Sequence, residues 1–99
     1  MITQKIDERK EEEAFELAKL KYPTIPEAVL HGFISYYIHK HALGSFCMAC
    51  LENNLTEVFI KGDENSLKGL KEIVTFLYGD FPAYCWGSKE KVDKFLGDE

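Results

Sequence analysis

The sequence has no long hydrophobic run, little positive charge and few cysteines, and each of these absences argues against a class of protein. No stretch reaches the length of about 18 apolar residues that a membrane span needs, so we expect no contact with a membrane. The formal net charge of -5 argues against binding to DNA or RNA polymers, which requires a basic surface. The three cysteines are an odd number and are expected to stay as thiols in a reducing compartment.

The sequence also lacks the short motifs that mark common catalytic sites. It contains no glycine-rich phosphate loop, no nucleophile elbow and no H-E-x-x-H zinc motif. Cysteine–histidine pairs would be the remaining nucleophile and base, but no spacing favours any one pair. The residues concerned are Cys47, Cys50, Cys85, His31, His39 and His41. We therefore expect that the protein is not an enzyme.

The residues that are present predict one small helical domain. With 99 residues, of which 45% are hydrophobic and 29% charged, the chain can form a single globular core, although a thin one. Residues 1–23 are expected to form a peripheral, mostly solvated helix that frays at its start and ends before Pro23. Residues 24–97 are expected to form the core. The N-terminus is acidic where a signal peptide would be apolar, which predicts a cytosolic location.

Apolar spacing and capping residues predict an all-α fold of five or six short helices. After the N-terminal helix, the expected helices span residues 26–41, 45–51, 55–61, 64–78 and 88–97. A capping box of Thr24 and Glu27 is expected to open the first of them. The expected N-caps of the others are Ser45, Asn54, Asp63 and Ser88.

The helix over residues 64–78 has the clearest pattern, and Gly79 is expected to end it. Its expected apolar face consists of Leu67, Leu70, Ile73, Val74, Leu77 and Tyr78. By contrast, the apolar run at residues 58–60 is short enough to fit a strand as well as a helix. A helix is preferred there because the sequence contains no second strand signal to pair with it.

Cys47 and Cys50 form C-M-A-C, which is the spacing of half a zinc site. The pair lies among apolar residues of a predicted helix, where cysteine commonly acts as a small buried hydrophobe. A redox C-x-x-C motif would need a βαβ context that the sequence does not provide. We therefore expect no metal and no cofactor, and the purified protein should contain no stoichiometric zinc.

The segment FPAYCWGSKEKVDKF near the C-terminus is the most informative part of the chain. Tyr84 and Trp86 offer aromatic faces on which nucleotide bases stack. Ser88 opens a helix whose free N–H groups suit a phosphate, and Lys89 and Lys91 add positive charge. A purely structural alternative remains open, in which Trp86 packs on the core, Ser88 only caps the helix and the lysines are solvated.

Two runs, GSFCMACLENNL and KGDENSLKGLKEIVTFLYGDFPAYCWGSKEKVDKFL, resemble a widespread family of small phage and prophage proteins. The pattern of that family closes with C-W-G-S-x-E-K-V, which this chain reproduces from Cys85 to Val92. The resemblance covers residues 26–96. The chain departs from the pattern where FISYYIHKHAL replaces a short turn, so the ends of the second helix are the least defined.

The family is similar to phage anti-CBASS nucleotide sponges, which bind the cyclic dinucleotide signal of a bacterial defence system without cutting it. The resemblance implies a homo-oligomer, a dimer or tetramer, that sequesters a ligand such as cGAMP in the cytoplasm of the infected host cell. The expected ligand-binding residues are Tyr84, Trp86, Ser88, Lys89, Lys91, Asn53, Asn54, Tyr36 and Tyr37. For Asn53 and Asn54, helix capping is the alternative role. The alternative function is a protein–protein interaction module that inhibits a host protein directly.

Overall fold

The computed structural model describes residues 11–97, which contain seven α-helices and one short 3₁₀ turn. The helices are α1 (Glu11–Lys21), α2 (Glu27–His39), α3 (Ser45–Leu51), α4 (Leu55–Lys61), α5 (Glu64–Lys68), α6 (Leu70–Asp80) and α7 (Lys89–Gly97), and the 3₁₀ turn is η3 (Ala83–Cys85). Within this range there is no strand, so the all-α prediction is confirmed there and residues 58–60 are helical, but the predicted count of five or six helices is too low. No helix among these residues is long and apolar enough to span a bilayer. The first turn predicted for the N-terminal helix lies outside the described residues.

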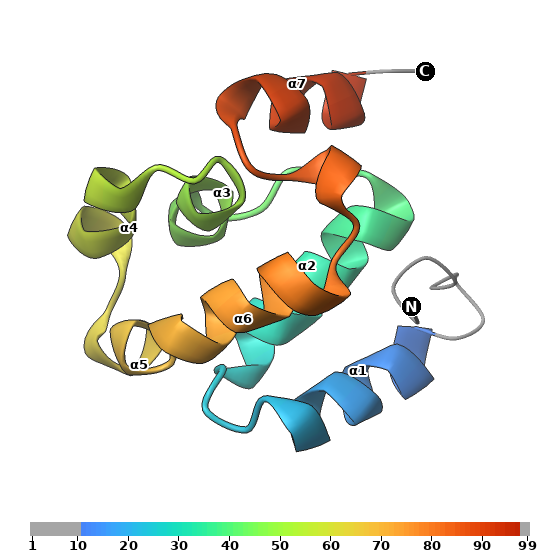
Figure 1. Cartoon of the computed structure of the whole chain (residues 1–99), viewed down its shortest axis with the longest axis vertical. Coiled ribbons are helices and arrows are strands. Elements are labelled where there is room, and N and C mark those ends of the chain that lie inside the picture. The colour runs from blue at the N-terminus through green and yellow to red at the C-terminus, as the bar shows by residue number, and fades with distance from the viewer. Residues whose placement is uncertain (1–10, 98–99) are drawn as a thin grey trace.

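The centre of the molecule is the contact between α2 and α6, which run through the middle of the view in Figure 1. Phe33 of α2 has no exposed surface, and its ring centroid lies 6.2 Å from that of Phe76 on α6. Phe81, just after α6, packs against the same Phe33 ring at 6.3 Å. Aromatic rings from both halves of the sequence therefore fill one core, with α7 beyond one end of it (Figure 1).

α1 contributes one narrow face to that core. Phe15 and Ala18 are buried, and the Phe15 ring stacks on His31 of α2 at a centroid distance of 3.7 Å. Leu17 and Leu20, on the other side of the helix, remain exposed. The weak amphipathicity predicted for this helix therefore corresponds to one buried row of side chains.

The predicted capping box at the start of α2 is wrong, because both of its residues have partners elsewhere. Pro26 occupies the N-cap position and makes no side-chain hydrogen bond there. The backbone N–H and the hydroxyl of Thr24 donate to Glu72 Oε1, at 2.9 and 2.8 Å. Glu27 forms an ion pair with Lys19 of α1. The hydrogen bonds of Thr24 connect the α1–α2 corner to α6, and the ion pair of Glu27 joins α2 to α1.

The single helix predicted over residues 64–78 is also wrong, because the structure interrupts it at Gly69. A Cβ atom on Gly69 would lie 2.4 Å from the carbonyl oxygen of Thr24, so the backbones of these two segments approach more closely than any side chain allows. The helix resumes at Leu70 and passes through Gly79 to end at Asp80.

The buried face of α6 differs from the predicted one by a small rotation. Ile73, Phe76 and Leu77 are buried, whereas Val74 and Tyr78 are 52% and 84% exposed. The prediction omitted Phe76 and placed two exposed residues inside. The rotation leaves an apolar strip of α6 facing outward.

Three of the four predicted side-chain caps are confirmed. Asn54, Asp63 and Ser88 accept hydrogen bonds from backbone N–H groups of the first helical turn that follows each of them, at 3.3, 2.8 and 3.1 Å. Ser45 is instead the first residue of α3, and Gly44 occupies the N-cap position. α2 ends at His39, two residues earlier than predicted, because Lys40 adopts a left-handed conformation.

Candidate functional site

The loop between α6 and α7 is fixed by hydrogen bonds to α2 and α3. The hydroxyl of Tyr36 donates to the carbonyl oxygen of Cys85 at 2.7 Å. The N–H of Gly87 donates to the carbonyl oxygen of Leu51 at 2.7 Å. Tyr36 has no exposed surface, and burial raises the pKa of its hydroxyl. The structure therefore places Tyr36 in the core, where it has no surface to offer a ligand, and the Gly87 N–H is not free to bind a phosphate.

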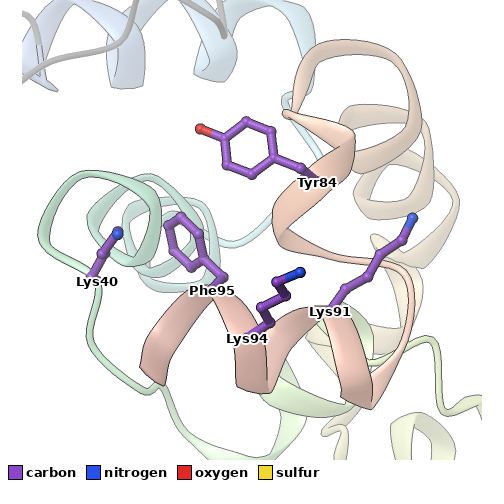
Figure 2. A pocket seen from close by; sticks show the side chains of 5 residues that line it. All are labelled: Lys40, Tyr84, Lys91, Lys94 and Phe95. Atoms are coloured by element: carbon purple, nitrogen blue, oxygen red, sulfur yellow. The ribbon is translucent and has the colours of Figure 1, made fainter. Parts of the chain in front are cut away.

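The fixed loop forms one wall of a cleft of about 390 Å³, which we call the lysine cleft. Its lining residues are Lys40, Tyr84, Lys91, Lys94 and Phe95. Lys40 follows α2, Tyr84 lies in η3 and the other three belong to α7, so three separate segments meet here (Figure 2). The volume lies within the range of about 300–1,000 Å³ that is typical of small-molecule pockets.

The aromatic side of the lysine cleft combines one exposed ring with two supporting rings. Tyr84 is 63% exposed, and its ring centroid lies 6.1 Å from that of Phe95. The Tyr84 hydroxyl donates to the hydroxyl of Tyr37 at 3.3 Å, and the Tyr37 ring stacks on Phe95 at 6.3 Å. Burial raises the pKa of Tyr37 to about 12, so its hydroxyl stays neutral. The cleft therefore contains one exposed aromatic ring, that of Tyr84, supported by Phe95 and Tyr37.

The charged side of the cleft consists of three lysines and contains no acidic residue. Among residues 11–97, Lys40, Lys91 and Lys94 form no ion pair. The Lys40 ammonium lies 5.2 Å from the centroid of Phe95, and Figure 2 shows Lys91 and Lys94 projecting from α7 on the side of Tyr84. In a chain with a net charge of -5, this is a local positive site that attracts anions.

Trp86 and Asn53, two of the predicted binding residues, lie in a different hollow. They line an apolar groove of about 100 Å³ between α4 and α6, together with residues such as Leu55, Val74 and Leu77. Trp86 is half-buried and packs against the core, as the structural alternative for this residue predicted. The structure therefore does not bring Tyr84 and Trp86 together around one ligand.

The remaining predicted residues occupy structural positions next to helices. Asn54 caps α4 and Ser88 caps α7. Asn53 ends α3 with a left-handed backbone, at a φ of 60°. Lys89 does not line the lysine cleft and pairs with Asp93 on its own helix, Nζ to Oδ2 at 3.3 Å. Of the predicted set, Tyr84 and Lys91 line the lysine cleft, and Tyr37 supports it.

Sequence reasoning missed Lys40, Lys94 and Phe95. For two of them a signal was present: Lys94 and Phe95 lie three and four residues after Lys91, and such residues share one face of a helix. For Lys40 there was no such signal, because it reaches the cleft only through the packing of α2 against α7.

The cysteines have the properties of buried structural residues. Cys50 and Cys85 are buried and Cys47 is partly buried. Burial raises their pKa values, to about 11 for Cys47 and about 12 for the other two. Thiols with such values are protonated at neutral pH and react poorly as nucleophiles. Residues 11–97 contain no group of three or more His, Cys, Asp or Glu that could hold a metal ion.

Comparisons with protein-family models, curated proteins and solved structures gave no significant match to this chain. The lysine cleft is the feature of the described residues whose chemistry indicates a ligand. Three cations that form no ion pair within residues 11–97, beside an exposed aromatic ring, suit a ligand that is both anionic and flat.

Proposed function

We propose that the protein is a phage immune-evasion protein that binds and sequesters a cyclic dinucleotide such as cGAMP without cleaving it. The observation that carries the proposal is the lysine cleft, in which Lys40, Lys91 and Lys94 surround the aromatic pair of Tyr84 and Phe95. A cyclic dinucleotide combines phosphodiester charges with flat bases, so it requires cations next to an aromatic face.

The lining residues divide into two roles in this proposal. The lysine ammonium groups bind the phosphate oxygens, and one base stacks on Tyr84, a contact of about 1–3 kcal/mol for each base. None of the five lining residues is a carboxylate or a histidine, the usual general bases for attack on a phosphodiester. The composition of the cleft thus favours retention of the ligand over its hydrolysis.

The number of aromatic faces favours a site shared between copies of the chain. A cyclic dinucleotide has two bases, whereas the lysine cleft presents a single exposed ring, that of Tyr84. In a homo-oligomer of the kind that the family resemblance implies, the second base stacks on a surface of another copy. We therefore propose a dimer or tetramer as the binding form.

The proposal is tested by incubating the purified protein with a panel of cyclic di- and trinucleotides. A sponge is stabilised against heat, because a ligand at 100 times its Kd contributes about 2.7 kcal/mol to the native state. Denaturing the complex should then release the intact ligand. Recovery of a converted product would indicate an enzyme. An unchanged melting temperature with the whole panel would overturn the proposal.

A second candidate function, direct binding of a host protein, is favoured by one specific observation. Large apolar side chains are exposed on the outer surfaces of α4 and α6. They are Leu55, Phe59, Ile60, Val74 and Tyr78, which range from 52% to 84% exposed. Exposed apolar side chains that gather on neighbouring elements commonly mark interaction surfaces.

Sedimentation velocity separates the two uses of this apolar surface. If it joins copies of the chain, Tyr78→Lys should convert an oligomer to a monomer, because a lysine would carry its charge into the contact. If the parent protein is already a monomer, the surface is free for a different protein, and the interaction function gains support over the oligomeric sponge.

A further inference from the structure

Lys40 combines an unfavourable backbone conformation with a position in the lysine cleft. Its φ and ψ are 54° and 55°, which is the left-handed region, and its N–H donates to the carbonyl oxygen of Tyr36 at 2.9 Å. The residue that ends a helix in this conformation is usually glycine, because a Cβ atom makes it strained. A lysine here destabilises the fold relative to a glycine.

The side chain of Lys40 makes no contact in residues 11–97 that would explain this choice by charge pairing. Its ammonium forms no ion pair there and is exposed. Instead, the position of Lys40 after the end of α2 places its ammonium 5.2 Å from the centroid of the Phe95 ring on α7. Figure 2 shows Lys40 on the opposite side of Phe95 from Lys91 and Lys94.

Strained backbone conformations collect at functional sites, where the side chain they place is needed. We propose that Lys40 is a ligand-binding residue: its ammonium completes a three-cation site for a phosphate-bearing ligand with a flat ring, at the expense of fold stability. The inference rests on the proposed function in that it concerns the same cleft, but it extends to noncyclic nucleotides as well as cyclic dinucleotides.

The competing explanation is that the cation–π contact with Phe95 alone holds Lys40 in place for stability. Three substitutions distinguish the two explanations. Lys40→Gly removes both the strain and the charge, Lys40→Met keeps the strain and most of the stem but removes the charge, and Lys40→Arg keeps the charge. Lys71→Met is the matched control, because it removes an exposed lysine from α6, which does not line the cleft.

Two measurements are needed on each purified variant: the melting temperature without ligand, and the Kd by calorimetry for two probes, cGAMP and ADP. We expect Lys40→Gly to melt about 4–8 °C higher than the parent, because it relieves a left-handed lysine in a small domain. We expect Lys40→Gly and Lys40→Met to weaken probe binding about fivefold or more. Lys40→Arg and Lys71→Met should bind like the parent.

The outcomes separate this inference from the proposed function. If ADP binds and cyclic dinucleotides do not, the proposed function fails, and the Kd values for ADP still decide the role of Lys40. If cGAMP binds equally well to the parent, Lys40→Gly and Lys40→Met, the sponge proposal survives and the inference is overturned. A lower melting temperature for Lys40→Gly, or no binding of either probe to the parent, also overturns it.

Discussion

The hydroxyl of Tyr36 donates a 2.7 Å hydrogen bond to the carbonyl oxygen of Cys85, and neither residue has any exposed surface. The bond joins the last turn of α2 to the 3₁₀ turn that carries Tyr84. The position of the exposed aromatic face therefore depends on a contact inside the core. A residue that the sequence suggested as a ligand contact instead holds the loop on which the ligand would bind.

Tyr36→Phe should destabilise the protein, because it leaves the buried carbonyl oxygen of Cys85 without its donor. We expect a loss of about 1–3 kcal/mol in the free energy of unfolding. Thermal or urea unfolding followed by circular dichroism measures it. Tyr37→Phe is the control, since it removes a longer bond of 3.3 Å to the exposed Tyr84. Equal losses in the two variants would contradict the role given to the buried bond.

Two glycines of the same segment should respond in opposite directions to alanine. Gly69→Ala places a Cβ atom 2.4 Å from the backbone oxygen of Thr24, so the α1–α2 corner must move away from α6. We expect a destabilisation of about 1–3 kcal/mol, typical of overpacking. Gly79→Ala has no atom within 4 Å of the new Cβ and lies inside α6, so it should stabilise by about 0.5–1 kcal/mol. Denaturant midpoints of the two variants should fall on opposite sides of the parent value.

Asp80 gives the protein an acid-sensitive contact between α1 and α6. Desolvation raises the pKa of its carboxyl, but hydrogen bonds from Lys21 at 2.9 Å and Tyr22 at 2.6 Å outweigh that effect and leave the pKa below its usual value. A depressed folded-state pKa contributes stability that is present above the unfolded pKa of about 3.9 and is lost as the pH falls through the folded value.

Below about pH 4, the parent should therefore lose stability more steeply than Asp80→Asn, which has no carboxyl to protonate. In Tyr22→Phe, one stabilising donor is removed, so the pKa of Asp80 should rise toward its usual value. Carboxyl titration by nuclear magnetic resonance measures that pKa directly. An unchanged Asp80 titration in Tyr22→Phe would show that the hydrogen bond has no influence on it.

The parts of the fold that could be predicted from the sequence are those that depend on residues close together in the chain. The caps at Asn54, Asp63 and Ser88 follow from a side chain and an N–H three residues apart. The break at Gly69 could not be predicted in this way, because its cause is the backbone of Thr24, which approaches only in the folded chain.

The same distinction explains which parts of the lysine cleft were predicted. Tyr84 and Lys91 lie within one segment whose composition suggested a ligand, and both line the cleft. Trp86 lies in the same segment, but the extended backbone at that residue turns it toward the groove between α4 and α6. Lys40 follows α2, far from this segment in the sequence, and lines the cleft only because α2 packs against α7. The composition of this segment thus predicted which loop contributes to the cleft. Which of its side chains line the cleft could be seen only in the structure.

The sharpest test of the lysine cleft compares two lysines that are two residues apart on α7. Lys91 lines the cleft, whereas Lys89 lies outside it and pairs with Asp93. Lys91→Glu and Lys89→Glu change the net charge equally, and an acid in the first turn of a helix is compatible with its dipole. If the two variants bind a ligand with different affinities, the difference is therefore due to the position of the new charge and not to the net charge of the protein.

We expect Lys91→Glu to weaken cGAMP binding about tenfold or more, near 1.4 kcal/mol, because it places an anion beside the phosphates. Lys89→Glu should weaken binding much less, although its new repulsion with Asp93 slightly destabilises α7. Calorimetry gives the affinities, and unchanged circular dichroism spectra exclude unfolding as the cause. Equal losses in the two variants would mean that the ligand meets the N-terminal turn of α7 and not the lysine cleft, as the sequence alone had suggested for Ser88 and Lys89.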